Sequence, residues 1–332
     1  MGAESILYAG TIGQGVWRSL DYGETFHRHS AGMFLEAEVR ALAVHPHEPQ
    51  TLYAGTDAGI YRTGNGGDSW ERLDTPFDPG RGWPSGMEVW SLLIHPRNPN
   101  ILFAGICPSA LYRSRDAGAS WQKLDAALTP ECKPILFSRV TCLLADPIEE
   151  STLWAGVEVD AVWRSGDMGE SWQRLDNGLS SADIHSLAMV PGTPKLLIAS
   201  TNNDLNISRD DGATWQPQNV KRSFPHAYCR GIASKSDDPR VLFLGNGNGP
   251  PGTTGTLQIS RDGGESWQEA TLPVAPNSTI WTFATHVEQP ELIYGASING
   301  YLYRSVDGGR NWTKCTHEFG EVRSLALTTA SG

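Results

Sequence analysis

The chain has 332 residues, and 26 Lys and Arg against 37 Asp and Glu give it a formal net charge of −11. This acidic balance, without a long basic run, argues against general nucleic-acid binding, and no stretch is long and apolar enough to span a membrane. The 36 Gly, 21 Pro and 12 Trp favour many short strands joined by sharp turns.

The N-terminal residues and the cysteines both bear on where the protein resides. Met1 to Ser5 contain no basic segment and no long apolar core follows them, so no signal peptide is predicted. The five Cys are odd in number and show no spacing pattern, which favours a reducing cytosol over a disulfide framework. We therefore expect a cytoplasmic protein.

The predicted elements follow one order along the chain. The second unit has a strand at 39–44, a Pro-containing turn, strands at 51–55 and 60–62, and a last strand from Trp70. We name these strands A, B, C and D. The chain begins with a B strand at 6–10 and ends with an A strand at 321–327. Its first unit therefore lacks strand A, and its last unit consists of strand A alone.

A motif that reads S-x-D-x-G-x-x-W separates strands C and D. Its Asp can accept backbone hydrogen bonds and close a turn, its Gly permits a strained backbone, and its Trp supplies apolar packing. Two variant copies are Ser19 to Phe26, which ends on Phe, and Thr63 to Trp70, which has Thr and Asn in place of Ser and Asp. The full copies are Ser114 to Trp121, Ser165 to Trp172, Ser208 to Trp215, Ser260 to Trp267 and Ser305 to Trp312. Successive copies begin 43 to 52 residues apart, a period typical of propellers or solenoids.

These copies resemble the Asp-box (BNR) repeat, which occurs in sialidases, sortilin-type receptors, xyloglucan-acting glycosidases and photosystem II assembly factors of the Ycf48 type. The resemblance implies a β-propeller and leaves the family open. Residues 1–332 then form one domain, an all-β, seven-bladed β-propeller of four-stranded antiparallel blades. We expect the C-terminal strand (321–328) to join the N-terminal strands (5–30) in one blade, which closes the ring and protects the strand edges.

Strand direction assigns the loops to two faces. Antiparallel strands reverse at each turn, so the Asp boxes and the A–B turns lie on one face. The D–A connectors and B–C loops lie on the other, which we call the top face. Three long segments are expected there: connector 70–89, which contains Trp83, connector 121–140, and loop 245–255. Long loops in a compact repeat fold favour a functional role, although tolerated insertions would give the same pattern.

Alignment of the seven A strands predicts two rings of side chains around the top of the channel, which together we call the collar. The outer ring contains Glu38, Glu88, Arg139, Asp183, Tyr228, Thr279 and Glu321. The inner ring contains Arg40, Trp90, Thr141, His185, Arg230, Trp281 and Arg323. Below it, the same register predicts an apolar layer of Leu42, Leu92, Leu143, Leu187, Ile232, Phe283 and Leu325.

The collar predicts a pocket for a small anionic or polyhydroxylated, sugar-like ligand. Guanidinium groups suit carboxylates and phosphates, and Trp rings offer flat faces for stacking. The predicted ligand-binding residues are Arg40, Arg139, Arg230, Arg323, Trp90 and Trp281. The predicted proton-transfer groups of a hydrolase or lyase are His185, Glu88, Glu38, Asp183 and Tyr228. We expect a monomer without a cofactor.

Three other interpretations stay open. Glu38 and Glu321 could pair with Arg40 and Arg323 and plug the channel. A non-catalytic scaffold, as the Ycf48-type resemblance implies, would bind a protein partner through the long connectors and Trp83. A cytosolic glycosidase would need two carboxylates that face each other across a cleft, and the candidates are Glu38, Glu88 and Asp183. Three collar arginines resemble those of sialidases, but no motif identifies the other sialidase residues in this chain.

One repeat position is rich in residues that can bind metals: His45, His95, Asp146 and His286. Each lies at an A–B turn, where its side chain can accept hydrogen bonds from the backbone, and this favours a turn over a metal site. The sequence contains no phosphate-binding Gly motif, nucleophile elbow or metal-binding motif. No metal is therefore expected.

Overall fold

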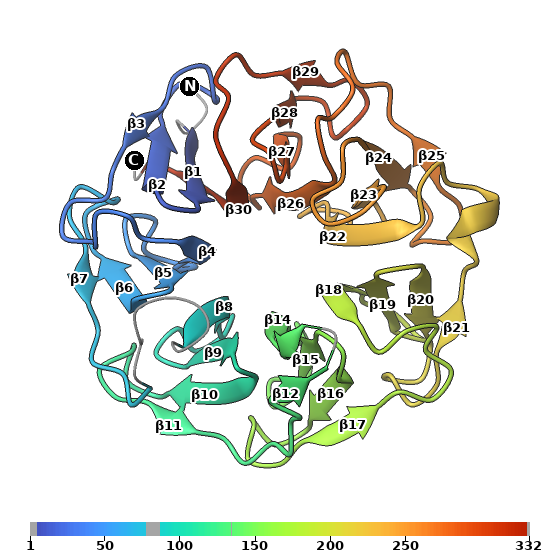
Figure 1. The fold of residues 1–332 in the computed structure, drawn as a ribbon, viewed down its shortest axis with the longest axis horizontal. Coiled ribbons are helices and arrows are strands. Elements are labelled where there is room, and N and C mark those ends of the chain that lie inside the picture. Colours follow the sequence, from blue (N-terminus) through green and yellow to red (C-terminus); the bar gives the residue numbers. More distant parts are fainter. Residues whose placement is uncertain (1–4, 78–86, 134, 331–332) are drawn as a thin grey trace.

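The computed structural model describes residues 5–77, 87–133 and 135–330. In these ranges, seven four-stranded antiparallel sheets surround a central channel, which confirms the seven-bladed, all-β propeller (Figure 1). Within the same ranges, the helical content is one 3-10 helix, η1 (Val220–Arg222), and no helix is long and apolar enough to cross a membrane.

The strands of each blade follow one another from the channel outward. Blade 1 contains β30 (Val322–Thr329), β1 (Ser5–Thr11), β2 (Gly15–Ser19) and β3 (His27–Arg28). Blade 2 contains β4 (Val39–Val44), β5 (Leu52–Thr56), β6 (Gly59–Thr63) and β7 (Glu71–Arg72). Blade 3 contains β8 (Glu88–Ile94), β9 (Leu102–Cys107), β10 (Ala110–Ser114) and β11 (Gln122–Lys123). Blade 4 contains β14 (Val140–Ala145), β15 (Leu153–Val157), β16 (Ala161–Ser165) and β17 (Gln173–Leu175).

The remaining blades have the same order. Blade 5 contains β18 (Ile184–Val190), β19 (Leu196–Thr201), β20 (Leu205–Ser208) and β21 (Gln216–Pro217). Blade 6 contains β22 (Tyr228–Ser234), β23 (Leu242–Gly247), β24 (Gly255–Ser260) and β25 (Gln268–Glu269). Blade 7 contains β26 (Ile280–Thr285), β27 (Ile293–Ser297), β28 (Leu302–Ser305) and β29 (Thr313–Lys314). A separate hairpin of β12 (Glu131–Cys132) and β13 (Leu136–Phe137) lies in the connector between blades 3 and 4.

The two ends of the chain share blade 1, as predicted. β30 is antiparallel to β1, and their pairing runs from Ser5 opposite Thr329 to Thr11 opposite Val322. Leu327 of β30 is only 4% exposed and belongs to the same apolar cluster as Leu7 of β1. The last strand therefore closes the ring through both backbone pairing and side-chain packing.

The Asp boxes are hydrogen-bonded turns. In blade 4, the buried Ser165 hydroxyl accepts a hydrogen bond from the Gly169 amide at 2.8 Å and donates one to Asp167 Oδ1 at 2.8 Å. Asp167 Oδ1 also accepts from the Ser171 amide at 2.9 Å. These bonds, together with the one from the Ser171 hydroxyl to Asp167 Oδ2, hold the pKa of Asp167 at about 2. The motif is thus a structural clamp.

Adjacent blades approach each other closely at glycines in their second strands. A Cβ atom on Gly105 would lie 2.4 Å from the Val140 side chain of the next blade, and one on Gly55 would lie 2.6 Å from Val89. Both separations are too short for real contacts, so these positions require Gly. Blade 5 has Ser200 at the equivalent place, where its hydroxyl donates a 2.6 Å hydrogen bond to the main-chain carbonyl of the next blade.

The A–B turns use their His and Asp side chains as predicted. His45 Nδ1 accepts hydrogen bonds from the amides of His47 and Glu48, and Asp146 Oδ1 accepts from the amides of Ile148 and Glu149. The side chains of His95 and His286 accept equivalent bonds in their own turns. These four residues stabilise turns, which confirms the structural interpretation.

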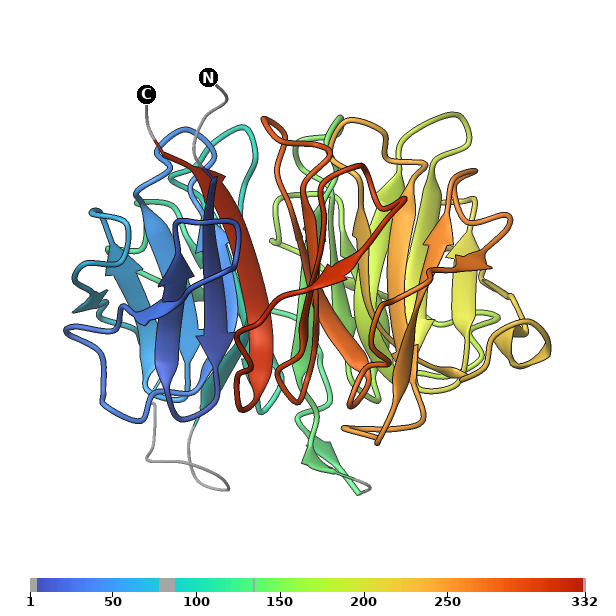
Figure 2. The same ribbon diagram turned by 90° about the horizontal axis from the view of Figure 1, so that it is seen from above.

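Both faces of the ring are visible in Figure 2. The green β12–β13 hairpin projects from the face opposite the one at which the red strand β30 ends, so the connector of residues 121–140 lies on the top face as predicted. The predicted loop 245–255 borders the same end of the channel, because Pro250 and Pro251 line a cavity there. Trp83 and the rest of 78–86 lie outside the described residues.

Candidate functional site

Each innermost strand contains a β-bulge at its inner collar position. In β4, Val39 pairs with Thr56 and Ala41 pairs with Gly55, so Arg40 has no partner residue on β5. A bulge bends its strand and re-aims the extra side chain, and bulges are enriched beside active sites. The other inner-ring residues at such irregularities are Trp90, Thr141, His185, Arg230, Trp281 and Arg323. The alignment predicted this ring, but not the bulges that present it.

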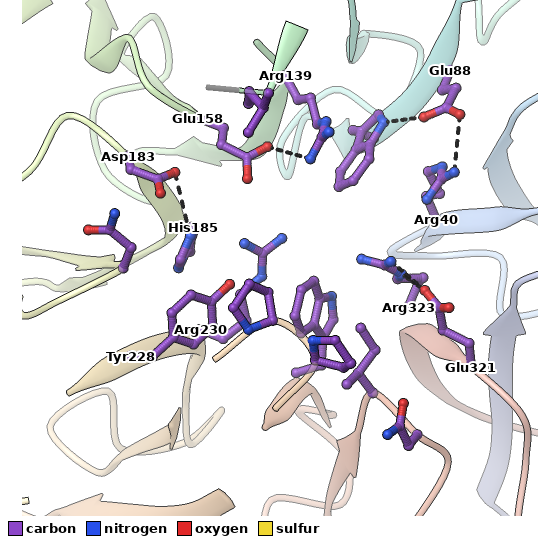
Figure 3. Close-up of a pocket in the computed structure, with 18 residues that line it drawn as sticks. Arg40, Glu88, Arg139, Glu158, Asp183, His185, Tyr228, Arg230, Glu321 and Arg323 are labelled. Carbon is purple, nitrogen blue, oxygen red and sulfur yellow. Dashed lines mark hydrogen bonds and ion pairs between the residues drawn. The ribbon is translucent and has the colours of Figure 1, made fainter. Parts of the chain in front are cut away.

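The collar surrounds a cavity of about 690 Å³ at the top of the channel (Figure 3). Every residue predicted for the site lines this cavity except Glu38. The sequence reasoning did not identify Glu158 and Asn202, which follow second strands, as part of the site. Both residues could have been found from the sequence, because each follows a B strand and the B–C loops were predicted to lie on the top face. A narrower cavity of about 150 Å³ continues beneath, between the inner-ring side chains and including Thr141.

Below the collar, the predicted apolar layer only partly fills the channel. Leu42, Phe283 and Leu325 line one concavity at the lower end, and Leu187 and Ile232 line another. Four of the predicted layer positions, those on β4, β8, β14 and β26, are half-buried and not fully enclosed. The layer therefore lines the lower channel instead of forming a closed core layer.

Most collar arginines form ion pairs with carboxylates. Arg40 contacts Glu38 and, at 3.1 Å, Glu88, while Arg323 contacts Glu321. Arg139 pairs with Glu158 at 2.8 Å, an interaction that the sequence did not predict. The pairs that could have plugged the channel are thus formed, but the cavity of about 690 Å³ is present beside them.

Arginines also pack over both collar tryptophans. The guanidinium carbons of Arg40 and Arg139, from the blades on either side, lie 4.7 and 4.6 Å from the Trp90 ring centre. Those of Arg230 and Arg323 lie 3.8 and 4.7 Å from the Trp281 ring centre. Such cation–π contacts contribute about 0.5–2 kcal/mol each, depending on desolvation. The tryptophans therefore hold the arginines in place around one side of the cavity.

Arg230 differs from the other three collar arginines. Arg230 is only 6% exposed, and no carboxylate of the described residues forms an ion pair with it. The neighbouring Arg323 has its pKa lowered to about 10, because burial and the nearby charges of Arg40 and Arg230 outweigh the pairing with Glu321. Several positive charges therefore lie close together in this part of the cavity wall.

A second group of polar side chains lines the same cavity beside Arg40, Arg230 and Arg323, which we call the arginine arc. His185 is buried, and its Nδ1 lies 2.7 Å from the Cys229 carbonyl oxygen, so Nδ1 carries the proton and donates it. Its Nε2 lies 3.5 Å from Asp183 Oδ1, and its ring centre lies 4.8 Å from that of Tyr228. Burial and the charge of Arg230 lower the pKa of His185, while burial raises the pKa of Tyr228. Neutral forms are favoured for both groups.

Comparison with known proteins identifies the repeat but does not resolve a family. A model described as "Sortilin, neurotensin receptor 3" (Sortilin-Vps10) matches residues 14–137, and the BNR/Asp-box repeat model matches residues 258–269. A xyloglucanase from Paenibacillus sp is 25% identical over 300 residues, which cover 83% of this chain. That match covers only 26% of the relative, so the chain spans about a quarter of its length.

Two solved structures share the fold. The GH74 xyloglucanase from Xanthomonas campestris superposes with a TM-score of 0.70 at 17% identity, over 96% of this chain and 55% of that protein. YCF48 bound to a D1 peptide superposes with a TM-score of 0.59 at 17% identity, over 89% of this chain and 93% of that protein. At these identities the likeness concerns the fold alone. An enzyme and a peptide-binding protein thus have the same architecture as this chain.

Proposed function

We propose that the collar cavity binds a small anionic or polyhydroxylated ligand and that the protein is a hydrolase or lyase acting on it. The observation that carries this proposal is Arg230, a buried guanidinium at the cavity wall with no carboxylate in ion-pair contact among the described residues. A buried charge without an opposite charge in contact with it is unfavourable. A carboxylate or phosphate of a ligand would supply that partner.

The arginine arc is suited to such an anion. Arg230 and Arg323 flank Trp281, which restricts both guanidiniums before a ligand arrives and so reduces the entropy lost on binding. A hydrogen bond to a charged group contributes about 1.5–3 kcal/mol. Two guanidiniums would therefore give a carboxylated ligand a clear advantage over a neutral one of the same shape.

The rest of the cavity wall suits hydroxyl groups. Asn202, Asn299 and Tyr228 line it and can donate or accept hydrogen bonds, and Ile135 and Pro250 supply apolar surface. Sugar acids combine a carboxylate with several hydroxyls, so they satisfy both parts of the cavity. The similarity to xyloglucanases supports a carbohydrate as the ligand class.

A glycosidase is the more specific form of this proposal. Glu158 and Asp183 both line the cavity, and each has a carboxylate oxygen within 4.8 Å of the other's. Retaining glycosidases hold their two carboxyl groups about 5–5.5 Å apart. The ion pair of Glu158 with Arg139 would have to loosen for Glu158 to act as an acid.

A non-catalytic scaffold is the second candidate. The similarity to YCF48, whose solved structure contains a D1 peptide, supports a protein partner. Leu136 of the β12–β13 hairpin is 53% exposed on the top face and would contact such a partner. A Leu136→Asp variant that no longer retains a partner in a pull-down would favour the scaffold. Partner capture that is the same for this variant and the wild-type protein would exclude this contact.

The ligand-binding proposal is tested with a panel of sugar acids, phosphorylated sugars and neutral sugars. Binding is measured by thermal shift and confirmed by calorimetry for wild-type protein, Arg230→Ala and Arg323→Ala. Arg240→Ala is the control, because Arg240 is 67% exposed and does not line the cavity. We expect an anionic ligand whose affinity falls in both collar variants and persists in the control. Binding that is unchanged in both collar variants refutes the proposal.

A further inference from the structure

Three side chains on one side of the collar cavity present metal-binding atoms to one another. Glu158 follows β15, Asp183 precedes β18 and His185 lies on the β18 bulge, so blades 4 and 5 both contribute. One ligand atom from each side chain lies within 4.8 Å of those of the other two. All three residues also line the cavity of about 690 Å³, as Figure 3 shows.

His185 is held in the orientation that a metal ligand needs. The Cys229 carbonyl accepts the Nδ1 proton at 2.7 Å, which fixes the tautomer and leaves the Nε2 lone pair free in the neutral ring. Histidines that bind metals almost always donate their other ring N–H to a carbonyl or carboxylate in this way. The His185 side chain is 1% exposed, so its position is set by packing as well.

The His185 ring and the Asp183 carboxylate lie side by side at the cavity wall. Nε2 and Asp183 Oδ1 are 3.5 Å apart, which is too long for a well-formed hydrogen bond. Asp183 Oδ1 is buried and accepts no hydrogen bond from the described residues. A buried carboxylate oxygen without a hydrogen bond is unfavourable in a low-dielectric site. A cation between Asp183 Oδ1 and His185 Nε2 would be bound by both atoms.

The spacing fits a zinc ion in particular. Zinc lies about 2.0–2.2 Å from nitrogen and oxygen ligands, so two ligands of a tetrahedral site are separated by about 3.4 Å. The 3.5 Å between His185 Nε2 and Asp183 Oδ1 agrees with that separation. Imidazole favours zinc and related transition metals over magnesium or calcium, which prefer oxygen ligands alone.

Glu158 completes the set, although it has a competing partner. Its Oε2 accepts a 2.8 Å hydrogen bond from Arg139. A metal ion would have to draw Glu158 toward Asp183 and His185, from a separation of up to 4.8 Å. Arg139 also packs on Trp90, so it retains a contact when Glu158 turns away. The pair therefore lowers metal affinity but does not block the site.

We propose that Glu158, Asp183 and His185 bind one divalent transition-metal ion, with Zn²⁺ as the first candidate, and leave a coordination position open to the cavity. No sequence motif marks this site, because its ligands come from a loop and a strand of different blades. The proposal does not rest on the collar ligand, since metal binding is measurable with the protein alone. Three protein ligands and one open position are typical of catalytic zinc sites.

The test is a titration of chelator-treated protein with Zn²⁺, followed by calorimetry. We expect one tight site per chain, and His185→Gln and Asp183→Asn should each weaken it at least about tenfold, since even outer-sphere changes weaken metal sites by about 10–100-fold. His286→Gln is the matched control, because His286 lies in a turn on the opposite face. Arg139→Gln should bind Zn²⁺ more tightly, because Glu158 loses its competing partner.

Cobalt provides an independent readout of the same ligands. Co²⁺ added to the wild-type protein and to His286→Gln should produce the same visible absorption bands, which His185→Gln should lose. Near-ultraviolet circular dichroism verifies that each variant is folded, and Asp183→Asn serves if His185→Gln is not. The absence of Zn²⁺ binding, or equal affinity in the wild-type protein, His185→Gln and Asp183→Asn, overturns the proposal. These metal-binding results do not depend on whether Arg230→Ala loses anion binding.

Discussion

The Asp box of blade 4 gives the sharpest test of how the fold is stabilised. Ser165 is 1% exposed, and its hydroxyl accepts the hydrogen bond of the buried Gly169 amide at 2.8 Å. In Ser165→Ala this amide loses the hydroxyl that accepts its hydrogen bond. A buried donor left without a partner destabilises a protein by about 1–3 kcal/mol. We expect that loss in the free energy of unfolding.

Ser171→Ala is the matched control in the same turn. Ser171 is exposed, and its hydroxyl donates to Asp167 Oδ2, so water can replace the lost partner. We expect a loss below about 1 kcal/mol. Urea denaturation, monitored by Trp fluorescence, measures the stability of both variants. Their midpoints are compared on condition that the unfolding free energy depends equally steeply on urea concentration in each. A loss in Ser165→Ala that is no larger than that in Ser171→Ala would refute the hydrogen-bond account of the motif.

Three further predictions concern closure, pH and ligand affinity. Leu327→Ala should lose about 2–5 kcal/mol of unfolding free energy because Leu327 is 4% exposed, whereas Leu35→Ala, at a site 70% exposed, should change it by less than about 0.5 kcal/mol in urea denaturation. The pKa of Asp167 is about 2 in the folded state, so its stabilising contribution is complete above about pH 4 and is lost as the pH falls toward 2. Urea midpoints at pH 5, 4 and 3 should therefore fall less steeply in Asp167→Asn than in the wild-type protein, and equal slopes would contradict this. Trp281→Leu removes the ring 3.8 Å from Arg230 and should weaken anion binding roughly 2- to 30-fold by calorimetry, so an unchanged affinity would show that stacking does not position the guanidinium.

The fold was predictable because its main signal repeats. Seven copies of the Asp box gave the blade number, and the missing A strand of the first unit predicted the closure by β30. Both inferences depend on order along the chain and on backbone hydrogen bonding, which local residue types largely determine. The turn role of His45 was predictable for the same reason, since its hydrogen bonds are to residues two and three positions away.

The site was predictable only to the level of strand register. The alignment identified the residues that surround the cavity, but the bulge at Arg40 inserts one residue into β4 and leaves no mark in the sequence pattern. Stacking of Arg230 on Trp281 depends on side chains from two blades, so neither sequence segment encodes it alone. Glu158 was missed because the path of its loop, and not its position in a repeat, brings it beside Asp183.

The central claim is that the buried Arg230 recognises a negative charge in the cavity. Calorimetric titration with glucose and with glucuronate, which differ by a carboxylate, tests it most directly. We expect glucuronate to bind at least about tenfold more tightly, because each hydrogen bond to a charged group contributes about 1.5–3 kcal/mol, and we expect Arg230→Gln to abolish that preference. Equal affinity for the two sugars, or a preference that persists in Arg230→Gln, would contradict the claim.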